Sequence, residues 1–375
     1  MTTVTVRRVE TEEERAALYR FRYDVYVEEF GMTTEADHER RWLRDAYDDD
    51  AVSYGLFGDG GIVGSLRCTY LSDLPDPAPL IDKFIMQPSI DRFGIAAALT
   101  TSRFILAPHL RHGRAIFRLM QAAHEDAVVR GARLNYGDCS PHLLPFYEQM
   151  GYRRYSSGFN DTAFGYKLPI LMLVRDRAHM QSVRSPLARL IAEDHDDAEA
   201  RGWFAETYPD FVAPMSTTFL DNEAYLELLA ERVSGEPAHH IALMRGLTRE
   251  EANRFVAASS VIALQPGDHV IRSGDRENTV FAMLSGLAEV RTVPPPAPPI
   301  RILGAGDTFG EIGFLNGVAR TADVTASTPG EVLVLSGDSF DRLLRQEPVI
   351  AAKVLRNLAS ELALRLTETT RQVGR

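Results

Sequence analysis

Hydrophobic and polar positions alternate with short periods over the first 180 residues. Residues 15–30 predict a helix in which Leu18, Phe21, Val25 and Tyr26 lie on an apolar side. Two strand-like runs follow, separated by Gly58-Asp59-Gly60, residue types that tolerate the positive φ of a tight hairpin. The other predicted elements are strands at 52–57, 61–70, 103–106 and 133–136 and helices at 114–130 and 142–150. This alternation predicts a mixed sheet with flanking helices.

The pattern changes twice along the rest of the chain. Residues 181–236 are polar and helical, and the acidic run at 193–197 predicts a solvated face because neighbouring carboxylates on a helix point apart. From Pro237 onward, short strands are separated by frequent Gly-Asp turns, which favours a small β-roll. A long helix follows Pro348, with an apolar stripe at Leu355, Leu358, Leu362 and Leu366. We therefore expect an α+β protein with domains at 1–180 and 237–375 and a helical connector at 181–236.

Composition excludes several classes of protein. The chain has 375 residues, with 41 Lys and Arg against 52 Asp and Glu, so its formal net charge is −11 and it lacks the basic footprint of a nucleic-acid binder. No apolar run approaches the length of a membrane span, and the first ten residues lack the apolar core of a secretory signal. Cys68 and Cys139 cannot form a disulfide framework. We expect a cytoplasmic protein without a metal site.

The most specific local pattern lies at residues 309–324. Gly310 precedes a short helical turn whose backbone N–H groups suit an anionic oxygen, and Glu311 can accept hydrogen bonds from sugar hydroxyls. Arg320 offers a planar donor fork for a phosphate, with the hydroxyl of Thr321 beside it. A cyclic nucleotide needs this combination of a carboxylate and a guanidinium.

This segment resembles the phosphate-binding cassette of cyclic nucleotide-binding domains, and the resemblance extends from about Ile241 through the final helix. It implies that Gly310, Glu311 and Ile312 hold the ribose and that Arg320 and Thr321 hold the cyclic phosphate. Thr321 is compatible with cAMP and with cGMP, and we predict cAMP as the effector. In that family the terminal helix closes over the base of the nucleotide. The apolar stripe of the last helix in this chain is compatible with that role and equally with a homodimer interface. No room remains after residue 348 for the DNA-binding module of the family's transcription factors, so we expect the output to come from the N-terminal domain.

A basic segment stands out in the N-terminal domain. No acidic residue occurs between Arg92 and His124, where five arginines lie. The stretch from Arg111 through Gly113, Arg114 and Ala115 joins a predicted strand to a predicted helix, a place where backbone donors and arginines can hold a pyrophosphate. A plain loop with exposed basic residues is the alternative.

Neighbouring motifs favour the first interpretation. The loop resembles the acyl-CoA loop of GNAT-fold acyltransferases, with Gly113 and Ala115 in place and Leu110 at the usual Arg or Gln position. Residues 141–152 resemble the last helix and turn of that fold, which implies a general acid at Tyr147. The segments at 22–29, 45–48, 64–67 and 102–104 resemble the acyl-homoserine lactone synthases and, more closely, the N-acyl amino acid synthases. That resemblance implies functional roles for Arg22, Asp45, Asp48, Arg67 and Arg103.

These resemblances predict an N-acyltransferase that moves an acyl group from acyl carrier protein or acyl-CoA to an amine, under control of a cyclic nucleotide. Thr100 stands where the family has a glutamate, so the proton acceptor for the amine is unassigned. Two alternatives stay open: a nucleotide-gated protein lysine acetyltransferase, and a sensor without catalysis. Cys139, His109 and His112 are interpreted as a buried thiol and solvated loop histidines.

Overall fold

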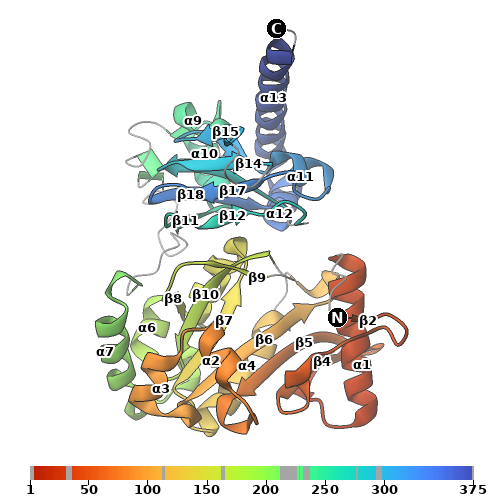
Figure 1. The fold of residues 1–375 in the computed structure, drawn as a ribbon, viewed down its shortest axis with the longest axis vertical. Helices are drawn as coiled ribbons and strands as arrows, with labels where there is room; N and C mark the ends of the chain where they lie inside the picture. The colour runs from red at the N-terminus through yellow and green to blue at the C-terminus, as the bar shows by residue number, and fades with distance from the viewer. Residues whose placement is uncertain are drawn as a thin grey trace. The chain divides into compact units, whose positions relative to one another are not determined.

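The structure, a computed structural model, describes residues 4–30, 36–111, 115–161, 165–211, 226–227, 229–230, 237–275, 278–292 and 298–373. It divides into two compact units, one built mainly from residues 1–213 and the other mainly from residues 214–375. Each unit has its own sheet system and its own hydrophobic core, and each is described by itself below (Figure 1). The described residues contain no helix long and apolar enough to cross a membrane.

A mixed sheet forms the frame of the N-terminal unit. Its strand order is β1-β4-β5-β6-β7-β10-β8, with β9 paired to β10. The strands are β1 (Thr5–Arg8), β4 (Val52–Gly58), β5 (Gly61–Tyr70), β6 (Ala98–Leu106), β7 (Leu134–Cys139), β8 (Tyr152–Arg154), β9 (Phe159–Asp161) and β10 (Gly165–Leu173), with a separate pair β2 (Ala36–Asp37) and β3 (Trp42–Leu43). The predicted hairpin is confirmed as β4–β5, and β6 begins five residues earlier than predicted.

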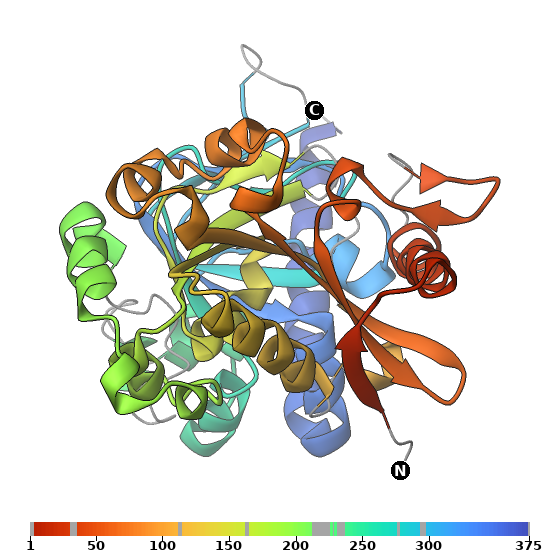
Figure 2. The same cartoon turned by 90° about the horizontal axis from the view of Figure 1, so that it is seen from below.

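Helices cover both faces of this sheet. They are α1 (Glu12–Tyr23), α2 (Ala78–Lys83), α3 (Gln87–Phe93), α4 (Ala115–Val129), α5 (Leu144–Met150), α6 (Arg177–Ser182) and α7 (Ala198–Thr207). Figure 2 shows the orange segment with α2 and α3 on the opposite side of the strands from the brown helix α4. Leu80 and Phe84 pack with Tyr136 of β7, whereas Leu119 of α4 lies against Gly64 of β5. Each face of the sheet is therefore covered by its own set of helices.

The helix predicted at 15–30 begins earlier and changes form. Thr11 caps this helix: its hydroxyl accepts from the backbone N–H of Glu14, and the Glu14 carboxylate accepts from the backbone N–H of Thr11. Two N–H groups that would otherwise be unpaired at the N-terminus of the helix thereby gain partners. After Tyr23 the chain continues as a π-helical turn over Asp24–Glu29. This turn places Tyr26, which is 8% exposed, inside the unit.

Strand β6 contains a bulge in its pairing with β5, and its pairing with β7 on the other side ends early. Ser65 of β5 pairs with Ile105 and Arg67 pairs with Ser102, so Arg103 and Phe104 together face one residue of β5. Arg103 has a φ of 53°, a left-handed conformation that costs an arginine about 1 kcal/mol. On its other side β6 pairs in parallel with β7 only as far as Thr100 and Tyr136, although both strands continue.

Residues 177–211, which the sequence places largely in the connector, pack on the N-terminal sheet. Ala200 and Phe204 belong to the same core as Leu134 and Leu171. Two carboxylates of the acidic run are paired with arginines: Asp197 with Arg133 at 2.6 Å and Asp196 with Arg201 at 2.7 Å. The described residues contain no cluster of metal-ligating side chains, in this run or elsewhere.

The C-terminal unit is a β-roll of two four-stranded sheets, which confirms the predicted fold class. The sheet orders are β11-β18-β13-β16 and β12-β17-β14-β15. The strands are β11 (Ser260–Leu264), β12 (His269–Ile271), β13 (Thr279–Ser285), β14 (Ala288–Arg291), β15 (Arg301–Leu303), β16 (Thr308–Phe309), β17 (Asp323–Ala326) and β18 (Gly330–Ser336). The proline-rich stretch at 293–297 lies outside the described residues.

Helices flank the roll and complete its core. They are α9 (Pro237–His240), α10 (Arg249–Val256), α11 (Glu311–Asn316), α12 (Gly337–Gln346) and α13 (Pro348–Val373). Leu358 of the predicted apolar stripe is buried in this core and Leu355 packs against it, whereas Leu366 is 68% exposed. The C-terminal half of α13 runs beyond the β-roll in Figure 1.

Candidate functional site

An alternating chain of arginines and aspartates lies at one face of the N-terminal sheet. Arg22 of α1 donates to Asp48 at 2.6 Å, and Arg67 of β5 contacts both Asp48, at 3.1 Å, and Asp45, at 2.5 Å. Arg103, at the bulge of β6, donates to the other oxygen of Asp45 at 2.7 Å. The structure thus joins the five polar residues that the sequence singles out by resemblance into one ion network.

Three serine hydroxyls add to this network. Arg22 donates to Ser65 at 3.2 Å and to Ser53 at 3.3 Å, and Arg67 donates to Ser102 at 3.1 Å. Ser53 of β4 and Ser102 of β6 are the register partners of Arg67, and Ser65 lies two residues before Arg67 on β5, so all three side chains lie on the same face of the sheet as that guanidinium. Sequence reasoning missed them because an isolated strand serine carries no functional signal.

Burial and charge act against each other in this network. Burial by itself raises the pKa of Asp45 and of Asp48, but the neighbouring guanidiniums outweigh it and hold both pKa values below the usual range. Both aspartates therefore stay anionic at neutral pH. The side chain of Asp45 is 20% exposed and that of Asp48 is 1% exposed, so Asp45 lies at the accessible end.

The predicted phosphate-binding loop is described only in part. Gly113 and Arg114 lie outside the described residues, as does His112. Arg111 forms a two-pronged ion pair with Glu29, at 2.5 and 2.7 Å, and donates to the carbonyl of Leu106. Ala115 begins α4 and is buried. In this structure the Arg111 guanidinium is thus paired within the protein, and a role toward an acyl donor stays a prediction.

An aromatic cluster lies where β6 and β7 separate. Phe104 of the bulge stacks on Phe146 of α5 with ring centroids 6.1 Å apart, and Phe117 of α4 lies 6.2 Å from Phe146. Tyr147, the predicted general acid, contacts Phe146 and Tyr152, and burial raises its pKa well above the ordinary value. Its phenol is therefore protonated at neutral pH, but a pKa raised so far lies away from the operating pH that favours a general acid, and the role of Tyr147 stays a prediction.

Two other residues of the N-terminal unit clarify the chemistry. Thr100, at the family's glutamate position, is 3% exposed and pairs with Thr69 and Tyr136 in the sheet, so it supplies no carboxylate. Cys68 is buried, and burial raises the pKa of its thiol to about 12, which excludes it as a thiolate nucleophile at neutral pH. Cys139 is buried as well, as predicted.

The predicted nucleotide cassette closes around the Arg320 side chain. Gly310 follows β16 and has a φ of 82°, and a Cβ added there would lie 3.0 Å from the Arg320 guanidinium and 2.9 Å from the Thr279 carbonyl. Arg320 is 5% exposed and donates to the carbonyls of Gly310 at 2.6 Å and Thr279 at 2.7 Å. Glycine is thus required at position 310 by its φ and by its close contact with the arginine.

Glu311 is paired with an arginine of the last helix. Its side chain is 7% exposed and accepts a hydrogen bond from Arg365 of α13 at 2.6 Å, and Arg365 also donates to the carbonyl of Thr308. Ile312 is 40% exposed, and Thr321 is exposed as well. Arg365 was missed in the sequence, because nothing in an amphipathic helix indicates which arginine reaches a carboxylate 54 residues away.

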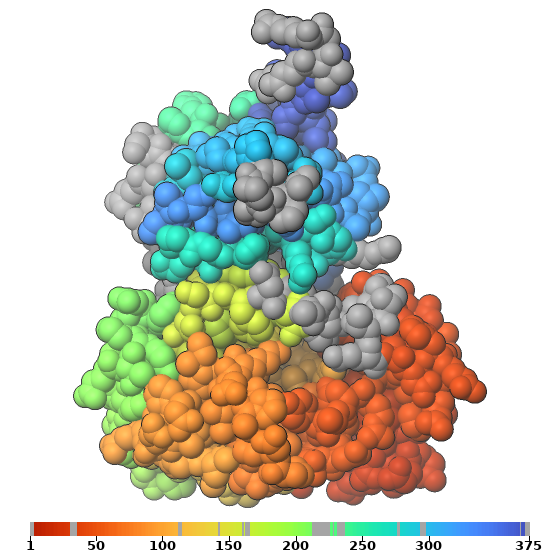
Figure 3. Space-filling model, viewed as in Figure 1, coloured from red at the N-terminus to blue at the C-terminus, as the bar shows by residue number. Residues whose placement is uncertain are grey.

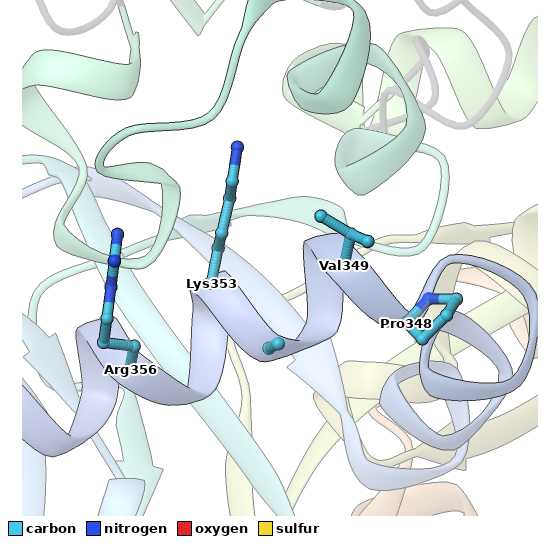
Figure 4. Close-up of a pocket in the computed structure, with 5 residues that line it drawn as sticks. Pro348, Val349, Lys353 and Arg356 are labelled. Carbon is cyan, nitrogen blue, oxygen red and sulfur yellow. The ribbon is translucent and has the colours of Figure 1, made fainter.

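A second feature of α13 is an open depression of about 420 Å³, lined by Pro348, Val349, Ala352, Lys353 and Arg356. Figure 4 shows Lys353 and Arg356 extending from the same side of the helix. Lys353 is held by Glu251 at 2.5 Å. Arg356 and Arg365 are separated by nine residues, about 14 Å along a helix, so this depression is separate from the nucleotide cassette.

Comparison with known families matches both halves of the chain. Residues 17–174 match the model of the N-acyl amino acid synthase FeeM, and residues 261–347 match the model of the cyclic nucleotide-binding domain. The predicted fusion of an acyltransferase domain with a cyclic nucleotide-binding domain is thereby confirmed. Every residue of the ion network lies inside the first match, and Glu311 and Arg320 lie inside the second.

Individual relatives resemble only part of the chain. Glutaminase 2 of Bradyrhizobium diazoefficiens is 36% identical over 35% of this chain and 21% of its own length, and the cAMP-dependent protein kinase regulatory subunit of Yarrowia lipolytica is 35% identical over 28% of each. The chain thus spans less than a third of the length of these curated relatives. A cyclic nucleotide-binding domain from Methylobacillus flagellatus, 26% identical, covers 46% of this chain and 93% of its own with a TM-score of 0.36.

Proposed function

We propose that the protein is a GNAT-type N-acyltransferase whose activity is controlled by a cyclic nucleotide. The acyl donor is a thioester of acyl carrier protein or CoA, and the acceptor is an amine, with amino acids as the first class to test. The observation that carries this proposal is the presence in one chain of a match to the N-acyl amino acid synthase FeeM and a match to the cyclic nucleotide-binding domain.

The geometry of β6 supports the acyl-transfer step. The bulge at Arg103 and Phe104 takes these two residues out of regular pairing with β5, and the parallel pairing with β7 has already ended at Thr100. A thioester placed in this opening has a backbone N–H of the bulge as donor for its carbonyl oxygen. Such a donor stabilises the negative charge that develops on the oxygen when the amine attacks.

The ion network supports recognition of a charged acceptor. Three guanidiniums surround two carboxylates, and the network is most open at Asp45 and Arg103, beside the bulge. This end offers the positive charge of Arg103 to the carboxylate of an amino acid. Positioning the amine against the thioester carbonyl is the main service the protein supplies, because orientation alone removes much of the barrier.

The Arg365–Glu311 ion pair supports control through α13. The carboxylate that we assign to the ribose is occupied by Arg365 in this structure, so a bound nucleotide has to displace the arginine. Displacement frees the C-terminal half of α13. The nucleotide therefore binds more tightly to the arrangement in which Arg365 has left Glu311 than to the arrangement in which the two are paired. A ligand can shift an equilibrium only through such a difference.

Purified protein incubated separately with acetyl-CoA and with a long-chain acyl carrier protein, each with a panel of amino acids, tests the proposal. We expect the long-chain donor to be consumed, amide to be detected by mass spectrometry, and cAMP to change the rate. Consumption of acetyl-CoA with acetylation of a protein lysine would instead support a protein acetyltransferase. If neither thioester is consumed while cAMP binds, the chain is a sensor without catalysis.

A further inference from the structure

The topology of the sheet places Asp138 beside the ion network. Strands β6 and β7 run parallel, and their last register pair is Thr100 with Tyr136. Side chains alternate along a strand, so Ser102 and Asp138, each two residues further on, lie on the same face as that pair. Ser102 is the hydroxyl that accepts from Arg67 at 3.1 Å. Asp138 therefore lies on the face that carries the network, next to the point where the strands separate.

The surroundings of Asp138 differ from those of the network aspartates. Its carboxylate lies 3.4 Å from the ammonium group of Lys83 at the end of α2, and its side chain is 24% exposed. The segment that carries Lys83, orange in Figure 3, forms part of the surface of the N-terminal unit. Asp45 and Asp48, by contrast, are held by guanidiniums. Asp138 is thus a carboxylate at an accessible place whose partner is a primary ammonium.

Electrostatic effects connect Asp138 with both ends of the proposed site. The pKa of Tyr26 is raised mainly by burial and further by Asp138, whereas Arg103, Arg22 and Arg67 act on it in the opposite direction. The pKa of Tyr147 is also raised mainly by burial, and Asp138 contributes. Its carboxylate thus acts on the tyrosine beside the network and on the predicted general acid, and the same carboxylate contributes at Tyr155.

This chain needs a proton acceptor that position 100 does not supply. An amine is protonated at neutral pH and cannot attack a thioester until it loses a proton. Thr100 is buried within the sheet and has no carboxylate, while Asp45 and Asp48 are each bound to two arginines. Asp138 lies on the neighbouring strand, two residues beyond the register partner of Thr100.

We propose that Asp138 binds the ammonium group of the amine substrate and accepts its proton, an inference that rests on the proposed acyltransferase function. The ammonium gives one proton to the carboxylate, and the freed lone pair attacks the thioester carbonyl carbon. The new C–N bond forms, the C–S bond breaks, and the second proton of the nitrogen is transferred to the leaving thiolate. One thiol and one amide result, and Asp138 passes its proton to solvent.

Lys83 indicates how the substrate is bound. Its ammonium group lies beside the Asp138 carboxylate, at the position proposed for the substrate's ammonium group. The structure therefore shows a primary ammonium bound at this carboxylate. When the substrate enters, its ammonium exchanges with that of Lys83. The freed lysine then adds a positive charge near the substrate's carboxylate, which favours an amino acid over a simple amine.

The pH profile of D138N tests the proposal. With the long-chain acyl carrier protein and the fastest amino acid of the panel, we expect D138N to lose about 100-fold or more in kcat/KM at pH 7. Because the variant depends on amine that has lost its proton in solution, its kcat/KM should rise about tenfold for each pH unit up to pH 9, more steeply than that of the wild type. The KM for the acyl donor should not change.

Two variants separate this role from a structural one. K83M removes the same ion pair and also the charge proposed near the substrate's carboxylate, so it is expected to raise the KM for the amino acid without steepening the pH profile of kcat. D73N removes a comparable ion pair with Arg130 elsewhere in the unit and is expected to keep full activity. A wild-type rate in D138N, or a loss that is equal at every pH, overturns the role of Asp138 and leaves the acyltransferase intact. A wild type that makes no amide with any amine refutes the proposed function itself.

Discussion

Arg365 of the last helix donates a hydrogen bond to the Glu311 carboxylate at 2.6 Å, in the cassette where the ribose of a cyclic nucleotide is expected to bind. The two residues come from α13 and from the start of α11, and both side chains are mostly buried. If Glu311 binds the ribose as proposed, the last helix competes with the nucleotide for one carboxylate.

Removing that competitor should strengthen nucleotide binding. Because a hydrogen bond between charged groups contributes about 1.5–3 kcal/mol, R365Q is expected to lower the Kd for cAMP by roughly tenfold, measured by calorimetry. R356Q, on the same helix but outside this contact, is the control. Weaker binding in R365Q would show that Arg365 contacts the nucleotide rather than competing with it.

Arg320 should matter for binding and for stability at once. R320A is expected to weaken cAMP binding by at least about 100-fold, since it removes the cation assigned to the phosphate. It also removes the hydrogen bonds from Arg320 to the carbonyl of Thr279 and to that of Gly310, which still accepts from the N–H of Phe314. This loss costs about 1–3 kcal/mol and should lower the melting temperature without ligand. R272A, an exposed arginine of the same unit, should change neither quantity.

Asp45 is expected to be essential for transfer to the amine. D45N weakens two ion pairs, with Arg67 and Arg103, at the open end of the network, and we expect kcat/KM for the amine to fall by about 100-fold. D49N, whose carboxylate pairs with Arg44 at the surface, should be nearly normal. Equal activities of D45N and D49N would refute a role of the network in catalysis.

The buried end of the network should dominate stability. D48N leaves the guanidinium of Arg22, which is fully buried, without its carboxylate, and an uncompensated buried charge costs about 3–5 kcal/mol. R22M should cost less, because Asp48 keeps Arg67. Urea unfolding followed by tryptophan fluorescence measures both, with D24N at the surface as control. A smaller loss in D48N than in R22M would contradict this order.

His124 should make the protein sensitive to mild acid. Its side chain is 3% exposed, neither ring nitrogen has a hydrogen-bond partner among the described residues, and burial lowers its pKa to about 4. Between pH 6.5 and pH 4 the unfolded chain therefore binds a proton that the folded chain does not. Stability is fully present above pH 6.5 and is lost as the pH falls toward 4, by at most roughly 3 kcal/mol.

The variant H124L tests this effect. Its unfolding free energy should fall less than that of the wild type between pH 6.5 and pH 4, whereas H195Q, at an exposed position, should follow the wild type. Parallel curves for H124L and the wild type would contradict the assignment.

The sequence predicts the elements better than their ends. The hairpin β4–β5 follows from alternation and a Gly-Asp-Gly turn, and both determinants are local. Strand β6 begins at Ala98 rather than at Arg103, because its first part is held by pairing with two neighbours, which no local pattern reports. The π-helical turn after Tyr23 is likewise not predicted, because the spacing of apolar residues indicates a helix but does not distinguish an α-helical turn from a π-helical one.

The candidate sites divide in the same way. Motif resemblance singles out the members of the ion network and of the nucleotide cassette, because these residues lie in recognisable sequence contexts. It does not reveal that Arg365 reaches Glu311, or that Lys83 reaches Asp138 across 55 residues. Such contacts depend on how distant segments pack, and a single sequence carries no local trace of them.

The ion network has a consequence for the order of folding. Its members are spread from Arg22 to Arg103, and the two arginines that flank Asp45 come from strands that must already be aligned in the sheet. A nascent chain that has emerged from the ribosome only as far as β5 still lacks the second of those arginines. The charges are therefore fully matched only once β6 is in register, so this part of the protein assembles late and as one piece.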